Sequence, residues 1–415
     1  MRLPYPKERR ERVIVIAQRA ELRDDAQVVG HVTRGRSLPV ESSEANRYQV
    51  WCKGRGVWIN RADVLPLDRA MDYFTEEIRQ NPIAADYAVR GWLRGGVGDL
   101  DGAMTDYDQA IRLEPKLESA YRCRGLVWRA KGEFDKAMAD CDTAVRLDPK
   151  SAFAYAVRGI LFTDKGESEK AIADFGIAID LDPSDSMAFY NRGVVWKAHG
   201  DDLEKAILDY SAAIRLDSKL LAAYANRGYA YRIKGDLDLA MADYDEAIRI
   251  YPKYTAAFGN RGLIWMAKGN YDQALADFDE AIRIDPMDVL GNSNRGFVLF
   301  KKGEFDKALA ACDEAIRLHP NYAYTYRHRA TLRATCPDQR FRDGPKAVED
   351  AKTAHKMKCW SVDILAVAYA ELGEFKTAIR LQTVAIKYAP ETEKKGWQDR
   401  LELYQAGKPY REVPT

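Results

Sequence analysis

Small and aromatic residues recur at helical spacing along most of the chain. Between Asp238 and Pro252, for example, Ala240, Tyr244 and Ala247 follow one another at intervals of four and three residues. This spacing places them on one face of a helix, and that face must be buried against another element. Asp238 is predicted to cap the start of this helix, and Pro252 follows its end because proline cannot continue a helix.

The same segment returns with a period of 34 or 35 residues. Each copy reads as a first helix, a glycine, a second helix and a closing proline, as in Ala223 to Pro252 and Ala257 to Pro286. The glycine favours the left-handed backbone that ends the first helix. A repeat of this length predicts a stack of helix hairpins. The closing positions are Pro115, Pro149, Pro183, Ser218, Pro252, Pro286 and Pro320.

The unit resembles the tetratricopeptide repeat, in which Gly, Tyr, Ala, an aromatic residue, Ala and Pro stand at fixed offsets in 34 residues. The resemblance implies a mainly α fold, a right-handed α-solenoid of about nine units over residues 83–390, with an expanded loop near 335–345. It also implies a half-repeat helix at 68–82 and a capping helix and tail at 391–415. In such solenoids the first helices line a concave surface that binds other molecules.

The hydrophobic period changes to two near the N-terminus. After a tail at 1–11, segments 13–16 and 48–51 alternate in the way that predicts short strands. Region 12–67 resembles the bacterial Src-homology-3-like (SH3-like) domain through Ala20-Glu21-Leu22-Arg23 and Gly56-Val57-Trp58-Ile59. A small all-β barrel is therefore expected, and its pairing with the repeats resembles a group of bacterial proteins. We interpret Trp51, Tyr48 and Trp58 as core residues; the alternative is a recognition surface.

The charge balance excludes a global attraction to nucleic acid or anionic lipid. The 64 Lys and Arg residues face 63 Asp and Glu residues, for a net charge of +1. We expect a protein partner and no nucleic acid. The apolar run from Val13 to Ala17 is too short for a secretory segment or a membrane span. The expected location is cytoplasmic, and a periplasmic or envelope location would require a start upstream of Met1.

Asparagine recurs once per unit on the first helix of four repeats. A carboxamide both donates and accepts hydrogen bonds, so such a row could hold the main chain of an extended peptide. Basic and aromatic residues at the same face would favour an acidic or aromatic-bearing peptide. The alternative is that the asparagines only solvate the groove or bond neighbouring helices. The predicted groove residues are Asn191, Asn226, Asn260, Asn294, Arg129, Lys197, Arg232, Tyr190, Tyr229 and Phe297.

An arginine follows this asparagine position in each unit and repeats in step with an aspartate of the second helix. Because a buried charge needs a partner, we interpret the two series as ion pairs within each hairpin. Ala311 breaks the aspartate series, so Arg295 must find another acceptor. The arginines are Arg90, Arg124, Arg158, Arg192, Arg227, Arg261, Arg295 and Arg329; the aspartates are Asp106, Asp140, Asp174, Asp209, Asp243, Asp277 and Asp350.

The chain carries no motif for a catalytic, metal or cofactor site. It lacks G-x-S-x-G, H-E-x-x-H and phosphate-binding loops, so we predict no enzyme and no cofactor. Cys141 and Cys312 stand in aromatic core positions and are expected to be small core residues. Cys336 lies in the expanded loop, where a helix end is favoured over a nucleophile. The predicted function is a non-enzymatic adaptor for an extended partner segment; the alternative is an envelope module whose barrel recognises wall peptide.

Overall fold

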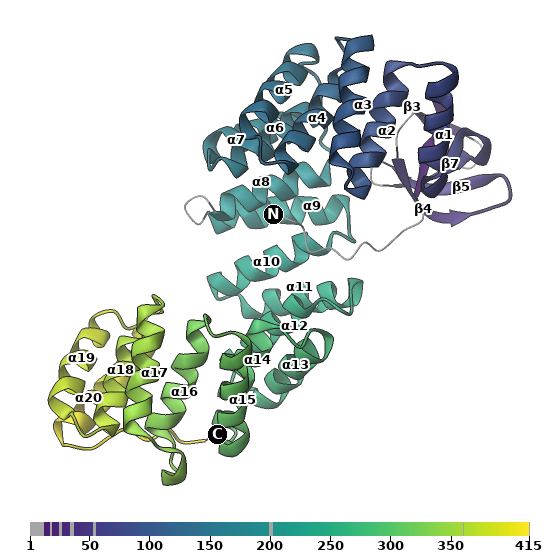
Figure 1. The fold of residues 1–415 in the computed structure, drawn as a ribbon. Coiled ribbons are helices and arrows are strands. Elements are labelled where there is room, and N and C mark those ends of the chain that lie inside the picture. The colour runs from purple at the N-terminus through teal and green to yellow at the C-terminus, as the bar shows by residue number, and fades with distance from the viewer. Residues whose placement is uncertain are drawn as a thin grey trace. The chain divides into compact units, whose positions relative to one another are not determined.

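The computed structural model describes residues 12–16, 19–24, 27–33, 37–52, 55–198, 202–359 and 361–414. The chain divides into two compact units, residues 1–223 and 224–415, which are described separately. Figure 1 identifies their elements. The helix α10 (Leu221–Lys234) begins at the end of the first unit and continues in the second.

The first unit opens with a small antiparallel sheet. Its strands lie in the order β3-β2-β6-β5-β4-β1-β7, and each strand pair is antiparallel. The bounds are β1 Arg12–Val15, β2 Arg19–Asp24, β3 Gln27–Thr33, β4 Ser37–Ser43, β5 Arg47–Cys52, β6 Arg55–Asn60 and β7 Val64–Pro66, with a 3-10 turn η1 at Arg61–Asp63. The predicted β region therefore forms a sheet domain, and its SH3-like identity stays a prediction.

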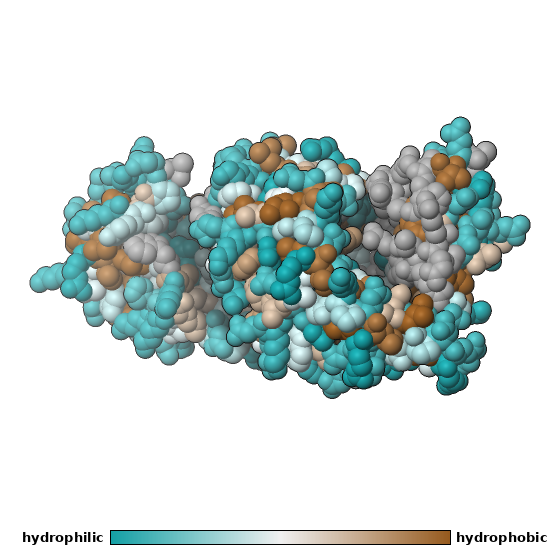
Figure 2. All heavy atoms as spheres, turned by 90° about the horizontal axis from the view of Figure 1, so that it is seen from above, coloured by the Kyte–Doolittle hydropathy of each residue, from teal (hydrophilic) through white to brown (hydrophobic). Residues whose placement is uncertain are grey.

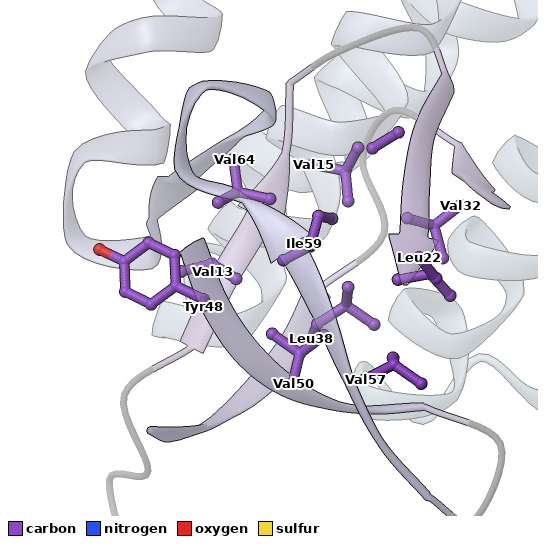
Figure 3. Packing of buried hydrophobic residues seen from close by; sticks show 11 residues of the cluster. Val13, Val15, Leu22, Val32, Leu38, Tyr48, Val50, Val57, Ile59 and Val64 are labelled. Atoms are coloured by element: carbon purple, nitrogen blue, oxygen red, sulfur yellow. The ribbon is translucent and has the colours of Figure 1, made fainter. Parts of the chain in front are cut away.

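The sheet encloses a core of mainly branched side chains. Val13, Val15 and Val50 are buried there with eight further residues, and Figure 3 shows the labelled aliphatic side chains gathered between the strands, with the Tyr48 ring at the edge of the group. Ile14 faces the other way. It is fully buried with Phe74 and Leu93 of the first helices, so β1 is buried on both faces and joins the sheet to the repeats.

The repeats of the first unit are antiparallel helix pairs. Strong contacts link each first helix with its own second helix, and weaker ones link successive first helices. The helices are α1 Leu67–Gln80, α2 Ala84–Val97, α3 Leu100–Leu113, α4 Glu118–Ala130, α5 Phe134–Leu147, α6 Ala152–Asp164, α7 Ser168–Leu181, α8 Ser186–Ala198 and α9 Leu203–Leu216.

The second unit continues the same pattern. It contains α11 Leu237–Ile250, α12 Thr255–Ala267, α13 Tyr271–Ile284, α14 Val289–Lys301, α15 Phe305–Leu318, α16 Ala323–Thr335, η2 Gln339–Phe341, α17 Gly344–Lys356, α18 Val362–Glu371, α19 Phe375–Lys387 and α20 Glu391–Gln405. The prediction of a mainly helical solenoid of hairpins behind a small β domain is confirmed.

Close approach of the paired helices explains the repeated glycine of the first helix. In the α12–α13 pair, a Cβ built on Gly262 would lie 2.7 Å from Cε1 of Phe278, whose ring is fully buried. The residues of α11 predicted to face inward, Ala240, Tyr244 and Ala247, are buried. The prediction for Asp238 is wrong: α11 begins after Asp236, and Asp238 instead pairs with Lys268 of the next repeat at 2.5 Å.

Candidate functional site

The predicted arginine and aspartate series forms ion pairs that join the two helices of a repeat. In each pair the guanidinium Nε and Nη2 donate to the two carboxylate oxygens; for Arg124 and Asp140 both distances are 2.8 Å. This bidentate geometry is the stronger form of an ion pair. The carboxylate of Asp140 raises the pKa of Arg124. The same pairing links Arg90 with Asp106, Arg158 with Asp174, Arg192 with Asp209, Arg227 with Asp243, Arg261 with Asp277 and Arg329 with Asp350.

A second set of carboxylates, which the sequence reasoning missed, extends these pairs between repeats. Arg124 Nη1 also donates to Asp108 Oδ1 at 2.7 Å, on the second helix of the preceding repeat. The same link joins Arg158 with Asp142, Arg261 with Asp245 and Arg329 with Asp313. Three of these aspartates stand two residues after an aspartate of the first series, and Asp313 stands two residues after Ala311, which replaces that aspartate. This regular spacing could have revealed them. One guanidinium therefore holds three helices together.

Arg295 depends on this second link because Ala311 replaces its first partner. Its Nε lies 2.8 Å from Asp279 Oδ1, and the two side chains are 44% and 49% exposed. The side chain of Arg261, which stands at the equivalent position of the preceding repeat, is 22% exposed. The missing acceptor thus leaves this arginine more open to solvent.

Two of the predicted asparagines make the same hydrogen bond within their own helix. Asn260 Nδ2 donates to the carbonyl of Ala256 at 2.8 Å, and Asn294 Nδ2 donates to that of Leu290 at 2.9 Å. The bond fixes the carboxamide and leaves Oδ1 as the acceptor. Asn260, Asn191 and Asn226 are half-buried, whereas Asn294 is only 6% exposed. Access to the row therefore differs between repeats.

The other groove residues predicted in the first unit are mostly engaged. Arg129 pairs with Asp164 at the end of α6, the neighbouring first helix, through Nε and through Nη2 at 3.1 Å. Tyr190 is 7% exposed and packs on Tyr210 with ring centroids 5.9 Å apart. Its ring is thus part of the core. Lys197 is half-buried on α8, and burial lowers its pKa.

In the second unit the predicted aromatic and basic residues stack on one another. The Arg232 guanidinium lies 5.3 Å from the ring centroid of Tyr229, which is 39% exposed. Lys301 Nζ lies 5.6 Å from the centroid of Phe297, and that ring also stacks on His328 at 4.9 Å. On the face drawn in Figure 2, hydrophobic side chains form small separate groups among hydrophilic ones.

His328 stands at the asparagine position of the repeat after Asn294. Its Nδ1 lies 3.2 Å from the carbonyl oxygen of Ser293, and burial lowers its pKa to about 4. Thr325 Oγ1 donates to Ser293 Oγ at 2.9 Å in the same interface. The first helices α14 and α16 are therefore joined by one buried and one partly buried polar contact at this point.

The cysteines and histidines do not assemble a reactive centre in the described part of the chain. Burial raises the pKa of the Cys141 and Cys312 thiols to about 12. Cys336 is fully buried against Leu299 and other apolar residues. Among the described residues, no group of three or more His, Cys, Asp or Glu side chains could hold a metal ion. His199 lies outside the described residues.

Arginines lie over two aromatic residues of the sheet. Tyr48 is 5% exposed with the Arg61 guanidinium 4.5 Å from its centroid, and Arg47 lies 4.0 Å from that of Trp58. The side chain of Trp51 lies outside the described residues. Tyr48 is thus a core residue, and recognition of wall peptide by this domain stays a prediction. In the part of the chain that the structure describes, no helix combines the length and apolar character that crossing a bilayer requires.

Family models of the tetratricopeptide repeat match five segments of the chain. They are residues 89–152 and 157–220, 222–254 and 291–322, and 262–303. These segments together span most of the repeats predicted from the sequence. A search of curated proteins found no match to the chain.

Three solved structures are similar to parts of this chain. The complex Cut9–Hcn1 of the APC/C is 16% identical with a TM-score of 0.50, over 72% of this chain and 59% of that one. A crystal structure of MamA is 28% identical over 39% of this chain and 94% of MamA, with a TM-score of 0.37. YrrB, described as a TPR protein with an unusual peptide-binding site, is 24% identical over 45% of this chain and 96% of YrrB, with a TM-score of 0.36.

Proposed function

The chain belongs to the tetratricopeptide repeat family, and we propose that it is a non-enzymatic scaffold that holds an extended segment of a partner protein along the first helices of its repeats. Repeat proteins of this kind bind through the surface that their stacked first helices share. A protein-interaction role fits the family; the peptide ligand and its position are the proposal.

The observation that carries this proposal is the fixed carboxamide of Asn260. Its Nδ2 is held by the helix at 2.8 Å while the side chain stays half-buried, so Oδ1 keeps one orientation. A prearranged acceptor loses little entropy when it receives a peptide N–H, which favours binding. Asn226 stands at the same position of the preceding repeat in the same unit.

Apolar side chains beside these asparagines would supply contact area. On α10, Tyr229 is 39% and Ile233 is 51% exposed. An exposed tyrosine offers a large rigid surface together with a polar tip, as binding sites often do. Arg232 over the Tyr229 ring adds positive charge, so an acidic or aromatic-bearing segment would be favoured.

The experiment is an affinity capture with three baits: the wild type, the double variant Asn226→Ala plus Asn260→Ala, and Asn321→Ala. Asn321 lies exposed in the turn between α15 and α16 and serves as the matched control. Mass spectrometry should show that the double variant recovers its main partner at least about tenfold less than the wild type, about 1.4 kcal/mol. Equal recovery by all three baits would rule out the asparagine row.

A further inference from the structure

The last residues of the chain return across the ends of three first helices. After α20 the chain runs as an irregular segment toward α15, as Figure 1 shows in yellow. Gly407 adopts a left-handed backbone with φ of 66°, which turns the chain out of the helix. Residues 408–414, here called the tail, then contact the C-terminal ends of α14, α16 and α18, all within the second unit.

Glu412 makes the central contact. Its backbone N–H donates to the carbonyl of Thr335 at 2.9 Å, at the end of α16. Its carboxylate pairs with Lys301 of α14, and these side chains are only 15% and 19% exposed. Lys301 also lies over the ring of Phe297, one of the predicted groove residues. The tail thus reaches the edge of the face proposed to bind a partner.

Arg411 makes a second contact of opposite charge. Its Nη1 lies 2.6 Å from Glu371 Oε2 at the end of α18 and donates to the Ala334 carbonyl at 3.2 Å. The other oxygen of Glu371 is held by Arg342 Nε at 3.2 Å. Glu371 is 13% exposed, so this carboxylate has a fixed position between two guanidinium groups.

The expanded loop explains how Arg342 comes to that place. Arg342 Nη1 donates to the carbonyls of Cys336 and Pro337 at 3.1 and 3.0 Å, so the loop holds its own arginine. A repeat of 34 residues lacks the longer loop that supplies this arginine. The insertion therefore builds part of the surface on which the tail lies.

These contacts have the chemistry by which a protein recognises an extended peptide. The backbone hydrogen bond to Thr335 sets the position of the segment. Lys301 and Glu371, which carry opposite charges, select a segment with Glu and Arg side chains. When such a segment leaves, each lost hydrogen bond or ion pair is replaced by bonds to water, so the net free energy that holds it is modest and the segment can exchange with another. The tail has no regular secondary structure of its own.

We infer that Lys301, Thr335 and Glu371 form a peptide-binding site for an extended segment that carries Arg followed by Glu, and that the tail is its ligand within the same chain. A partner segment of that chemistry binds only when the tail leaves. This site does not use the asparagine row, so it stands or falls independently of the proposed function.

The first test measures hydrogen exchange of the Glu412 amide in the full chain. In the wild type we expect slow exchange, and Lys301→Glu should accelerate it by about tenfold or more because the ion pair becomes repulsive. Lys301→Glu combined with Glu412→Lys should restore the protection. The matched control is Lys302→Glu, because the neighbouring Lys302 pairs with Asp272 and not with the tail. Circular dichroism confirms that each variant is folded.

The second test adds a labelled peptide of residues 406–414 to the full chain. A tethered segment has an effective concentration on the order of mM, so the free peptide should bind the wild type poorly. The variant Arg411→Glu plus Glu412→Lys should release its own tail and bind the peptide at least about tenfold more tightly. A peptide with Arg and Glu exchanged should not bind. Equal Glu412 exchange in the wild type and Lys301→Glu, or no gain in peptide binding, would overturn the inference.

Discussion

Arg261 on α12 and Asp277 on α13 form a bidentate ion pair, with Nε–Oδ2 and Nη2–Oδ1 distances of 2.9 and 2.7 Å. The aspartate side chain is 7% exposed and the arginine side chain 22%. Because the carboxylate is buried between two helices, its charge depends on this one partner. The pair therefore fixes how the two helices of the repeat pack.

Asp277→Ala is expected to destabilise the second unit by about 3 kcal/mol, because it leaves a partly buried guanidinium without its main acceptor. The denaturation midpoint in urea measures this change. Asp245→Ala is the matched control. The side chain of Asp245 is 55% exposed, and its removal leaves the pair between Arg261 and Asp277 in place. This variant should therefore lose less than about 1 kcal/mol of stability. Similar losses for both variants would contradict the assignment of Asp277 as the main partner.

Ala311→Asp should restore the pair that Arg295 lacks. The new carboxylate would occupy the position that Asp277 and Asp350 hold in other repeats, sixteen residues after Arg295 in the sequence. Two charge-assisted hydrogen bonds offset by burial of the carboxylate predict a gain of about 1 kcal/mol in the free energy of unfolding. Thermal denaturation measures it. A lower melting temperature than that of the wild type would show that Arg295 cannot turn toward α15.

The sequence predicted the repeats because their spacing is imposed by helix packing alone. Where two paired helices approach closely, as α12 and α13 do, a glycine such as Gly262 leaves room for the aromatic ring of a residue such as Phe278. The arginine and aspartate partners followed from the need to neutralise a buried charge. Such local rules recur from repeat to repeat, except where Ala311 replaces the aspartate.

The tail contacts could not be predicted in this way. Lys301 and Glu412 are separated by 111 residues and belong to no repeated pattern. The burial of Tyr190 and Asn294 was also missed, because the helical period shows which face a residue lies on but not how closely the next first helix packs over it. Both failures concern contacts set by neighbouring repeats.

Gly262→Ala should destabilise the protein by about 1 to 3 kcal/mol, because the added methyl group would lie 2.7 Å from the Phe278 ring. Gly96→Ala on α2 is the opposite case, since a Cβ there meets nothing within 4 Å. It should stabilise its helix by about 0.5 to 1 kcal/mol. The urea midpoints of the two variants should therefore shift in opposite directions, and a shift of the same sign would contradict the packing of α12 on α13.

His328 makes the stability of the second unit depend on pH. Burial, helped by the nearby charge of Arg327, lowers the pKa of its imidazole to about 4. An unfolded chain binds the proton near pH 6.5. Between these values the unfolded state holds more protons, so stability falls as the pH drops from about 6.5 to about 4, by up to about 3 kcal/mol. Above pH 6.5 the contribution is complete.

His328→Asn removes this dependence and places at α16 the residue that Asn260 and Asn294 supply in other repeats. We expect the variant to lose less stability than the wild type between pH 6.5 and pH 4, as measured by urea denaturation across that range. His355→Asn is the control, because His355 is exposed on α17 and its replacement should leave the wild-type profile unchanged. If His328→Asn and the wild type showed parallel profiles, the imidazole would have to be accessible to protons in the folded chain, and its contact with the Ser293 carbonyl would be wrong.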